Sequence, residues 1–466
     1  MNAALDWLEK HHEDLVRGLA DLVAIPSIST DGEHDHEIGR TARLVTDQMR
    51  EAGLQSVEEL RVGQSLPYAY GEWLEAGPEK PTIFLYAHHD VQPVNYVEQW
   101  KSDPWKLTRR DGRLYARGSA DDKAAITAFL GAIAAYRQTN TPLPVNLKMV
   151  VEGEEEIGSK NLLAFFEKYK QKIASDVIVV LDTENIEVGL PCITYSLRGI
   201  VAVRVDVTSA KLPVHSGMAG GALPDAALAL NAILGKLYWG NGPLPIPGFS
   251  DSVRPLTDKE RKAFGSLPWN EGKIRQEIGV VPGARLAMET GTTVYEATWR
   301  KPSVTVIAQE ASSLKGASNQ VLPTASAIVS CRIVPDQDPE RVAKHIADYL
   351  QADAPWGVEV KVTPCGSNPW WMTDPNGPAF EAAMASLRQG FDRDPVAIGC
   401  GGSIGFVGPL AELFGGAPAL LLGIEDPSSN AHAPNESLHE GDFKKLMNSL
   451  VRLFGHLGQL PKHGVK

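Results

Sequence analysis

The segment Thr82-Ile-Phe-Leu-Tyr-Ala-His-His-Asp90 joins a run of apolar residues to side chains that bind metals. A short, near-continuous apolar run is typical of a strand that is buried on both faces, as in a parallel sheet. In open α/β sheets, ligands bind beyond the carboxyl ends of the strands. The segment therefore predicts a buried strand over 82–87 with functional side chains at its end.

Three further apolar runs have the same form. They are Val145–Val151, Val177–Leu181 and Ala417–Gly423, and helical patterns over about 122–137, 161–170 and 379–388 separate the runs. Strands that alternate with helices predict an α/β domain with a mostly parallel sheet. The last run follows the third by more than 200 residues, so we expect an inserted domain between them.

The chain before the first of these strands has helical spacing. Apolar residues from Leu8 to Val23 predict one helix, and a second helical pattern covers about 36–52. Between them, Ala24-Ile-Pro-Ser-Ile-Ser is a helix breaker. Two helices are therefore expected here.

The middle of the chain has the pattern of a different fold. Valines at 201, 203, 205 and 207 alternate with other residues, as in a half-buried strand. Helical patterns over about 224–238 and 339–350, with strand patterns over 303–309, 325–334 and 358–362, complete the order β-α-β-β-α-β. This order predicts an inserted ferredoxin-like α+β domain.

The predicted domain boundaries follow from these patterns. Residues 1–197 and 368–466 would form the catalytic, metal-binding domain, and residues 198–367 the inserted domain. A Gly-, Pro- and Trp-rich stretch over about 240–300 would be an insertion within the second domain. A chain of 466 residues is long for a single core, which agrees with two domains.

Charge and composition narrow the expected partners and compartment. The 45 basic and 57 acidic residues give a net charge of −12, so neither nucleic acid nor a membrane surface is an expected partner. The N-terminus lacks the pattern of a signal peptide, and no run of about 18 apolar residues predicts a transmembrane helix. The four cysteines are scattered, with no CxxC motif, which favours reduced thiols in the cytoplasm.

Imidazole and carboxylate groups follow all four apolar runs. Gathered at one sheet edge, they would repel one another if unpaired. A divalent cation resolves this, because His nitrogen and carboxylate oxygen both bind zinc or manganese. The pattern therefore predicts a metal site. Its candidate residues are His88 and Asp90 after the first run, Glu152 to Glu156 after the second, Asp182 after the third, His432 after the fourth, and Asp121 before the helix that starts near 122.

The local spacing indicates supporting roles. Alternate strand residues point the same way, so Asp90 can hydrogen-bond the far nitrogen of His88 and fix the orientation of its ring. Glu155 and Glu156 are adjacent, which favours one metal ligand and one free base. Hydrolysis needs such a base to take the proton of a metal-bound water.

Six segments, in their order and spacing, carry a resemblance to a known family. They are Tyr86–Pro93, Leu114–Lys123, Glu152–Ser159, His215–Gly217, Gly401–Ile404 and Ala431–Glu436. Together they resemble the M20 family of metallopeptidases, and within it the dipeptidase, carnosinase-like branch. The resemblance covers nearly the whole chain.

The resemblance implies a site with two divalent metal ions, which mixed nitrogen and oxygen ligands would allow to be zinc, manganese or cobalt. Asp121 would bridge the ions, with His88 and Asp182 completing one site and Glu156 and His432 the other. The Asp121–Asp122 peptide bond would be cis.

Two acidic residues gain catalytic roles from the same resemblance. Glu155 would be the general base that activates the water bridging the metals and then protonates the leaving amine. Asp90 would orient His88.

The resemblance also assigns the inserted domain. It would be a lid and the homodimer interface, from which His215 would reach the partner's active site and polarise the scissile carbonyl. Arg332 would hold the substrate carboxylate, together with Gly402 and Ser403 in the Gly401-Gly-Ser403 turn.

Two departures affect this end of the site. The carnosinase-like branch often has Arg-Glu before Gly-Gly-Ser-Ile, whereas this chain has Gly399-Cys400. An extra polar residue in Ser318–Pro323 leaves open whether Asn319 or Gln320 faces the site.

The main functional hypothesis is hydrolysis of a dipeptide, or of a short peptide with a free C-terminal carboxylate. A rival is removal of an N-acyl, N-carbamoyl or N-succinyl group from an amino acid at the same metal site. A protein of another class, a metal-binding scaffold without turnover, is a remote alternative, because the proposed base is present along with all five ligands.

Overall fold

The computed structural model describes residues 1–465, which form two units. Unit 1 comprises Met1–Tyr195, Thr373–Ile398 and Phe406–Lys466. Unit 2 comprises Ser196–Met372 and Gly399–Gly405. Compared with the boundaries expected from the sequence, unit 2 also contains residues 196–197, residues 368–372 and the loop over 399–405.

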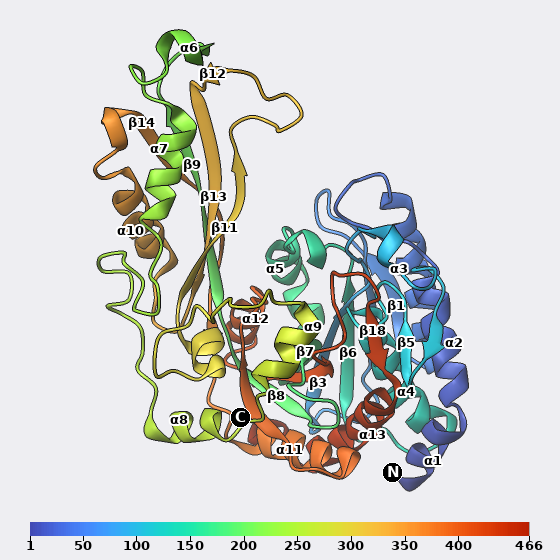
Figure 1. The fold of residues 1–466 in the computed structure, drawn as a ribbon. Coiled ribbons are helices and arrows are strands. Elements are labelled where there is room, and N and C mark those ends of the chain that lie inside the picture. The colour runs from blue at the N-terminus through green and yellow to red at the C-terminus, as the bar shows by residue number, and fades with distance from the viewer. Residues whose placement is uncertain (466) are drawn as a thin grey trace. The chain divides into compact units, whose positions relative to one another are not determined.

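A nine-stranded sheet with a parallel centre organises unit 1 (Figure 1). Four adjacent parallel strands coincide with the four apolar runs, which confirms the predicted parallel sheet. In sheet order they are β6 (Asn146–Glu152), β3 (Thr82–His88), β7 (Val177–Glu184) and β17 (Ala419–Glu425). The remaining strands are β1 (Gln55–Leu60), β2 (Tyr68–Trp73), β8 (Cys192–Leu197), β16 (Val396–Cys400) and the two-residue β15 (Trp371–Met372), which belongs to unit 2.

Helices cover both faces of the parallel strands. Along β3, Ile83, Leu85 and Ala87 join the main apolar core, while Phe84 points to the opposite face and meets Phe166 and Phe414 edge-on. Every residue of β3 is buried, as an apolar run in a parallel sheet requires. The helices of the main core are α1 (Asn2–Lys10), α2 (His12–Val23), α3 (Asp35–Ala52), α4 (Lys123–Gln138), α11 (Pro378–Phe391) and α13 (Glu440–Leu457); those of the other face are α5 (Leu162–Ile173) and α12 (Val407–Leu413).

The N-terminal helix prediction needs a correction. The region expected to hold a single helix up to Val23 contains two helices, α1 and α2, which meet at His11. The backbone of His11 leaves the helical region at φ −107° and ψ 13°. Its ring stacks on Trp7 and its Nδ1 lies 2.9 Å from the Trp7 carbonyl oxygen. The spacing of apolar residues does not reveal this break, because the helical periodicity continues across it.

Unit 2 contains a four-stranded antiparallel sheet (Figure 1). In sheet order its strands are β11 (Ser303–Glu310), β13 (Thr324–Ile333), β9 (Gly199–Thr208) and β14 (Glu359–Asn368). Helices α7 (Ala226–Gly235) and α10 (Pro339–Gln351) pack on the face where alternate residues of β9 are buried. The order of strands and helices confirms the predicted ferredoxin-like fold.

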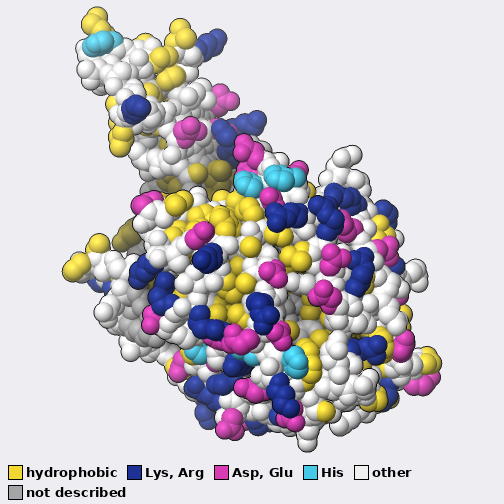
Figure 2. Space-filling model, turned by 90° about the vertical axis from the view of Figure 1, so that its right-hand side faces the viewer, with side chains coloured by type: hydrophobic (Ala, Val, Ile, Leu, Met, Phe, Trp, Pro, Cys, Tyr) yellow, Lys and Arg dark blue, Asp and Glu magenta, His cyan; other side chains and the backbone are white. Residues whose placement is uncertain are grey.

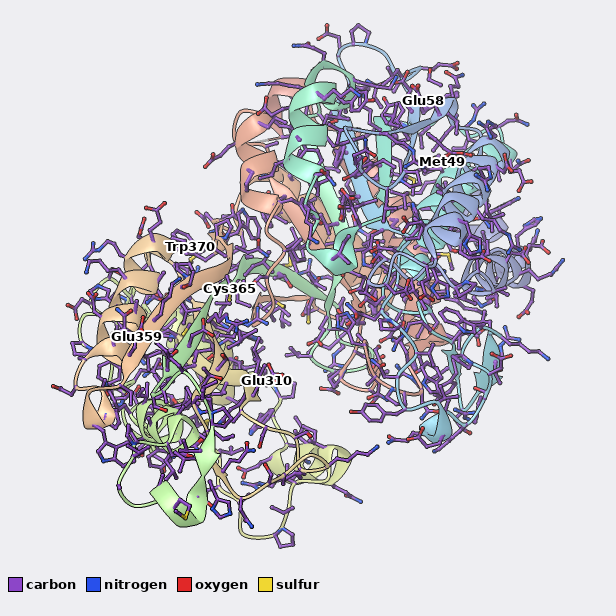
Figure 3. The ribbon with its side chains drawn as sticks, turned by 90° about the horizontal axis from the view of Figure 1, so that it is seen from above. Met49, Glu58, Glu310, Glu359, Cys365 and Trp370 are labelled. Carbon is purple, nitrogen blue, oxygen red and sulfur yellow. The ribbon has the colours of Figure 1, made fainter. Side chains whose placement is uncertain are left out.

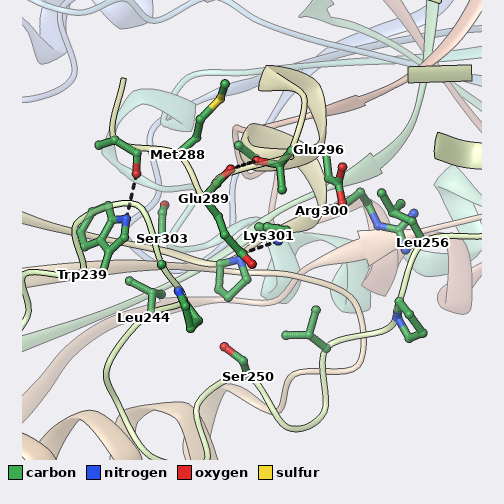
Figure 4. Close-up of a pocket in the computed structure, with 18 of the residues that line it drawn as sticks. Trp239, Leu244, Ser250, Leu256, Met288, Glu289, Glu296, Arg300, Lys301 and Ser303 are labelled. Carbon is green, nitrogen blue, oxygen red and sulfur yellow. Dashed lines mark hydrogen bonds and ion pairs between the residues drawn. The ribbon is translucent and has the colours of Figure 1, made fainter. Parts of the chain in front are cut away.

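The insertion of unit 2 forms an open pocket of about 690 Å³ (Figure 4). Helices α8 (Asp258–Gly265) and α9 (Glu271–Ile278) lie in this insertion, followed by a π-helical turn over Glu296–Arg300. The wall of the pocket mixes apolar side chains such as Trp239 and Leu244 with charged ones such as Lys301. No predicted site residue lines it.

Small sheets and turns complete the chain. A three-stranded sheet contains β4 (Thr108–Arg110), β5 (Arg113–Tyr115) and β18 (Ser437–His439). In unit 2, β10 (Val214–His215) pairs with β12 (Gln320–Val321), and the short helix α6 (Ser216–Ala219) follows β10.

The surface and the cysteines agree with the composition. Basic and acidic side chains are interspersed over the face shown in Figure 2. In residues 1–465, no helix has both the length and the apolar character that crossing a membrane demands. No disulfide joins the cysteines of the described chain. Cys192 and Cys331 are buried, whereas Cys365 is exposed on β14 (Figure 3).

Candidate metal centre

The five predicted metal ligands come from five separate segments of unit 1. The ends of adjacent parallel strands bring four of them together, and the turn before α4 adds the fifth. The Asp121–Asp122 peptide bond in this turn is cis, as predicted. His88 ends β3, Asp182 lies in β7, Glu156 lies in the turn η2 (Glu155–Ile157) after β6, His432 lies in the loop after β17, and Asp121 precedes α4.

Asp121 lies between two groups of ligand atoms. Its Oδ1 is 2.9 Å from Nε2 of His88, and its Oδ2 is 2.9 Å from Nε2 of His432. Potential ligand atoms of His88, Asp121 and Asp182 lie within 4.8 Å of one another. The same holds for Asp121, Glu156 and His432. The two carboxylate oxygens of Asp121 thus face two different sets of ligands.

The donor set fits divalent cations. Nε2 of His88 is buried and, despite its short distance to Asp121, has no partner with hydrogen-bond geometry. Burial, reinforced by the Asp121 and Glu156 carboxylates, raises the pKa of Asp182 to about 7. A cation among these groups would occupy the free nitrogen lone pair and offset the repulsion between carboxylates. Imidazole and carboxylate donors are those of zinc and manganese sites.

Asp90 connects His88 to the turn that carries the two glutamates. Its Oδ1 lies 3.5 Å from Nδ1 of His88, which lies closer, at 3.1 Å, to the Asp90 backbone oxygen. Its carboxylate also accepts hydrogen bonds from the backbone N–H groups of Glu155 and Glu156, at 3.2 and 3.0 Å. Burial alone would raise the pKa of Asp90, but the nearby His88 imidazole and a hydrogen bond from Ser29 hold it below its ordinary value.

Glu155 and Glu156 differ in what their carboxylates contact. Glu156 Oε2 lies 3.2 Å from His432 and accepts a hydrogen bond of 2.8 Å from Gln92. The carboxylate of Glu155 has no ion pair or hydrogen bond with any described residue. Burial, together with the negative charges of Asp182 and Glu156, raises the pKa of Glu155 well above its ordinary value.

Glu436 is a buried residue of this region that was not predicted as a site residue. Its Oε2 accepts hydrogen bonds from Nη1 of Arg117, at 2.6 Å, and from the backbone of Gly118, at 3.0 Å. Its Oε1 accepts from the backbone N–H groups of Ala120 and Asp121, at 3.0 and 3.1 Å. It therefore fixes the turn that presents Asp121.

Gln92 was also not predicted as a site residue. Gln92 lies in the motif Tyr86–Pro93, and Glu436 lies in the motif Ala431–Glu436. Their contacts cross long distances in sequence: 64 residues separate Gln92 from Glu156, and 319 separate Arg117 from Glu436. Membership of a motif was the only signal that marked them.

The four predicted substrate-binding residues belong to unit 2. His215 is exposed, its Nδ1 accepts a hydrogen bond of 3.0 Å from the Gly217 backbone, and its strand partner is Gln320. Arg332 is partly buried on β13, and its Nη1 donates to Oγ of Ser403 at 2.9 Å. The Gly402 N–H donates to the Cys400 sulfur at 3.3 Å. Arg332 and the 401–403 turn are thus brought together, while His215 lies on the separate β10–β12 ribbon.

Comparison with known proteins gives the same family as the motifs. Residues 84–456 match the model of peptidase family M20/M25/M40. A cysteinylglycine-S-conjugate dipeptidase of Corynebacterium striatum is 32% identical over 92% of this chain and 92% of its own. The human Beta-Ala-His dipeptidase is 28% identical over 99% of this chain and 93% of its own.

Solved structures agree on the fold. The crystal structure of human carnosine dipeptidase 1 superposes with a TM-score of 0.85 and 26% identity over 98% of each chain. The structure of the di-peptidase Dug1p from Saccharomyces cerevisiae has a TM-score of 0.87 and 22% identity over 98% of each chain. The chain belongs to peptidase family M20, and it is a metal-dependent hydrolase.

Proposed function

We propose that this enzyme hydrolyses dipeptides, or short peptides with a free C-terminal carboxylate, at a centre of two divalent metal ions. The observation that carries the two-metal site is the position of Asp121, whose oxygens face His88 on one side and His432 on the other. The full-length similarity to two dipeptidases supports the substrate class. Zinc, manganese and cobalt all suit the ligand set.

Each metal position would have its own ligands besides Asp121. His88 and Asp182 would hold one ion, and Glu156 and His432 the other. When bound, the ions supply Lewis acidity to the attacking water and the scissile carbonyl. Asp90 keeps the His88 ring in place and holds the backbone of the glutamate turn.

Glu155 would take the proton from the attacking water and pass it to the leaving amine. Its carboxylate is partly buried beside the ligands and has no partner among the side chains that the structure describes, whereas that of Glu156 is occupied by Gln92 and His432. A partly buried carboxyl with a raised pKa is suited to both accepting and returning a proton.

Unit 2 would supply the contacts to the substrate. Arg332 and Ser403, joined by a hydrogen bond, would hold the C-terminal carboxylate, with Gly402 beside them. His215 would stabilise the oxyanion in the active site of a partner subunit. Its exposed position at the end of β10 is compatible with a role in trans.

A homodimer formed through unit 2 would cover apolar side chains that are exposed in a single chain. Burial of large apolar side chains favours association, and β11 is an edge strand that offers unpaired backbone groups. Ile307→Asp should therefore give a monomer in sedimentation velocity and lower turnover. A fully active monomer would contradict the role of His215. The exposed fractions are 98% for Leu314, 87% for Met218, 72% for Leu212, 61% for Leu228 and 60% for Ile307.

The decisive experiment compares metal-loaded protein with chelated protein on a panel of dipeptides and of N-acyl, N-carbamoyl and N-succinyl amino acids. We expect turnover of dipeptides that chelator abolishes and metal restores. Glu155→Gln should keep its metal content and lose roughly 100-fold or more in turnover. Near-native activity of this variant would refute the base assignment, and turnover confined to the acylated amino acids would refute the peptide assignment.

A further inference from the structure

In unit 2, the Ser403 hydroxyl bonds both to the guanidinium of Arg332 and to the backbone of Arg198. Oγ of Ser403 accepts a hydrogen bond of 2.9 Å from Nη1 of Arg332 and donates one of 2.5 Å to the backbone oxygen of Arg198. Ser303, the cross-strand partner of Arg332, lies 3.4 Å from Nη1 of Arg198. Both guanidinium groups therefore border the 401–403 turn.

All the hydrogen-bond acceptors of these two guanidiniums are neutral. Arg198 donates from Nε to the Gly401 oxygen at 3.2 Å and from Nη1 to the Lys301 oxygen at 3.3 Å. Arg332 donates to Ser403. Among the side chains that the structure describes, neither arginine forms an ion pair with a carboxylate. Two positive charges thus lie near each other at a partly buried position without a described carboxylate partner.

The pKa values show the cost of this arrangement. Burial and the nearby charge of Arg332 lower the pKa of Arg198 to about 10, and burial lowers that of Arg332. The Cys400 thiol is the group that acts in the opposite direction on both. Partly desolvated charges of like sign are unfavourable unless a counter-charge is supplied. A bound anion would supply it.

Donors remain available for such an anion. Nε and Nη2 of Arg332, which form one planar edge of the guanidinium, have no hydrogen bond to a described residue, and neither has Nη2 of Arg198. None of the three is among the buried polar atoms that lack a partner. The Arg332 edge matches a carboxylate with two parallel hydrogen bonds. The Arg198 donor is then left for a second negative group.

We propose that Arg198 and Arg332 act together to select substrates whose C-terminal residue carries a second carboxylate, as aspartate or glutamate does. The inference rests on the proposed peptidase function and names its substrate class. One carboxylate of that residue binds Arg332 and Ser403, and the other neutralises Arg198. Arg198 is then a determinant of specificity beyond the carboxylate contact itself.

The test uses substrates of matched shape. The metal-loaded wild-type enzyme is assayed on Ala-Asp against Ala-Asn, and on Ala-Glu against Ala-Gln. Hydrogen bonds to charged groups predict a kcat/KM ratio of roughly tenfold or more in favour of the acidic member. In Arg198→Gln, which keeps hydrogen-bond donors but removes the charge, the ratio should fall toward unity. Arg198→Lys should keep much of the preference.

The matched control is Arg204→Gln. Arg204 also lies in the 198–208 segment, but it is exposed and paired with Asp206 at 2.9 Å. This variant should leave the ratio unchanged. Equal kcat/KM for the acidic and amide substrates in the wild type would overturn the inference while leaving the peptidase proposal intact.

A binding measurement separates the two proposals if no peptide is cleaved. Calorimetry with the products L-aspartate and L-asparagine requires no turnover. Tighter binding of aspartate, lost in Arg198→Gln, would support the double-cation site even if the peptidase proposal failed. Equal binding of the two amino acids would overturn it.

Discussion

Glu436→Gln offers a sharp test of how the metal centre is held together. The substitution keeps the size of the side chain and removes its charge. Glu436 and Arg117 are almost completely buried, with side-chain exposures of 0% and 2%, and their charged atoms lie 2.6 Å apart. Removing one partner of a buried ion pair leaves the other charge uncompensated, which costs about 3–5 kcal/mol.

The hydrogen-bond pattern gives a second reason for this magnitude. Both oxygens of Glu436 accept two hydrogen bonds, and all four donors are N–H groups. In either orientation, the amide NH₂ of glutamine would face two of these donors. The turn over Arg117–Asp121 would then have to move, and Asp121 with it.

The assay has two parts. Denaturant unfolding of chelated protein should show a loss of about 3–5 kcal/mol in the unit 1 transition, and calorimetric titration of refolded protein with zinc should show weaker binding. Glu412→Gln, at an exposed position of α12, is the control and should stay within about 0.5 kcal/mol of wild type. A Glu436→Gln variant with the stability and zinc affinity of wild type would refute the reasoning.

Three further predictions concern the centre and the core. Asp121→Asn should weaken the binding of both metal ions, whereas Asp182→Asn should weaken the binding of one, because only Asp121 faces both groups of ligands. Mass spectrometry of the metal content per chain distinguishes the two variants. Equal metal loss in both would contradict a bridging role for Asp121. Gln92→Ala should lower the metal affinity at the position that Glu156 binds by roughly 10-fold or more, because Gln92 holds this ligand by a hydrogen bond. An unchanged metal titration would exclude this role of Gln92. Burial raises the pKa of the Cys192 and Cys331 thiols to about 12. The folded chain therefore retains these protons above the unfolded pKa, near 9, and the free energy of unfolding should fall between about pH 9 and 12, by up to about 1.4 kcal/mol per pH unit for each thiol. Cys192→Ala should reduce that slope, and an identical slope would show that the thiol ionises equally in both states.

The parallel centre of the sheet was predictable because its strands are buried on both faces. All seven residues of β3 are buried, and so are all seven of β17, so their sequences are near-continuous apolar runs. The strand β1 could not be predicted from an apolar run, because only its last residue, Leu60, is buried. The helix break at His11 could not be predicted either, because apolar spacing does not register a change in backbone direction.

The candidate site divides in the same way. Side chains at strand ends were found because parallel topology alone brings them together. The division of work between Glu155 and Glu156 could not be derived from adjacency, and it depends on which carboxylate Gln92 contacts. The proposed role of Arg198 could not be derived from the sequence either. It depends on which side chains surround Arg198 in the folded chain, and the sequence does not show that no carboxylate pairs with it.

The contacts of Glu436 link the two halves of the metal centre. Glu436 lies four residues after His432 in the same loop, and its carboxylate holds the backbone of Asp121. One buried side chain therefore joins the loop that carries His432 to the turn that carries Asp121. A ligand that binds only the folded state stabilises that state. Metal binding and the Arg117–Glu436 ion pair should therefore each increase the stabilisation that the other provides. The destabilisation caused by Glu436→Gln should accordingly be larger in metal-loaded protein than in chelated protein. Equal losses in the two forms would show that the turn is held independently of the metals.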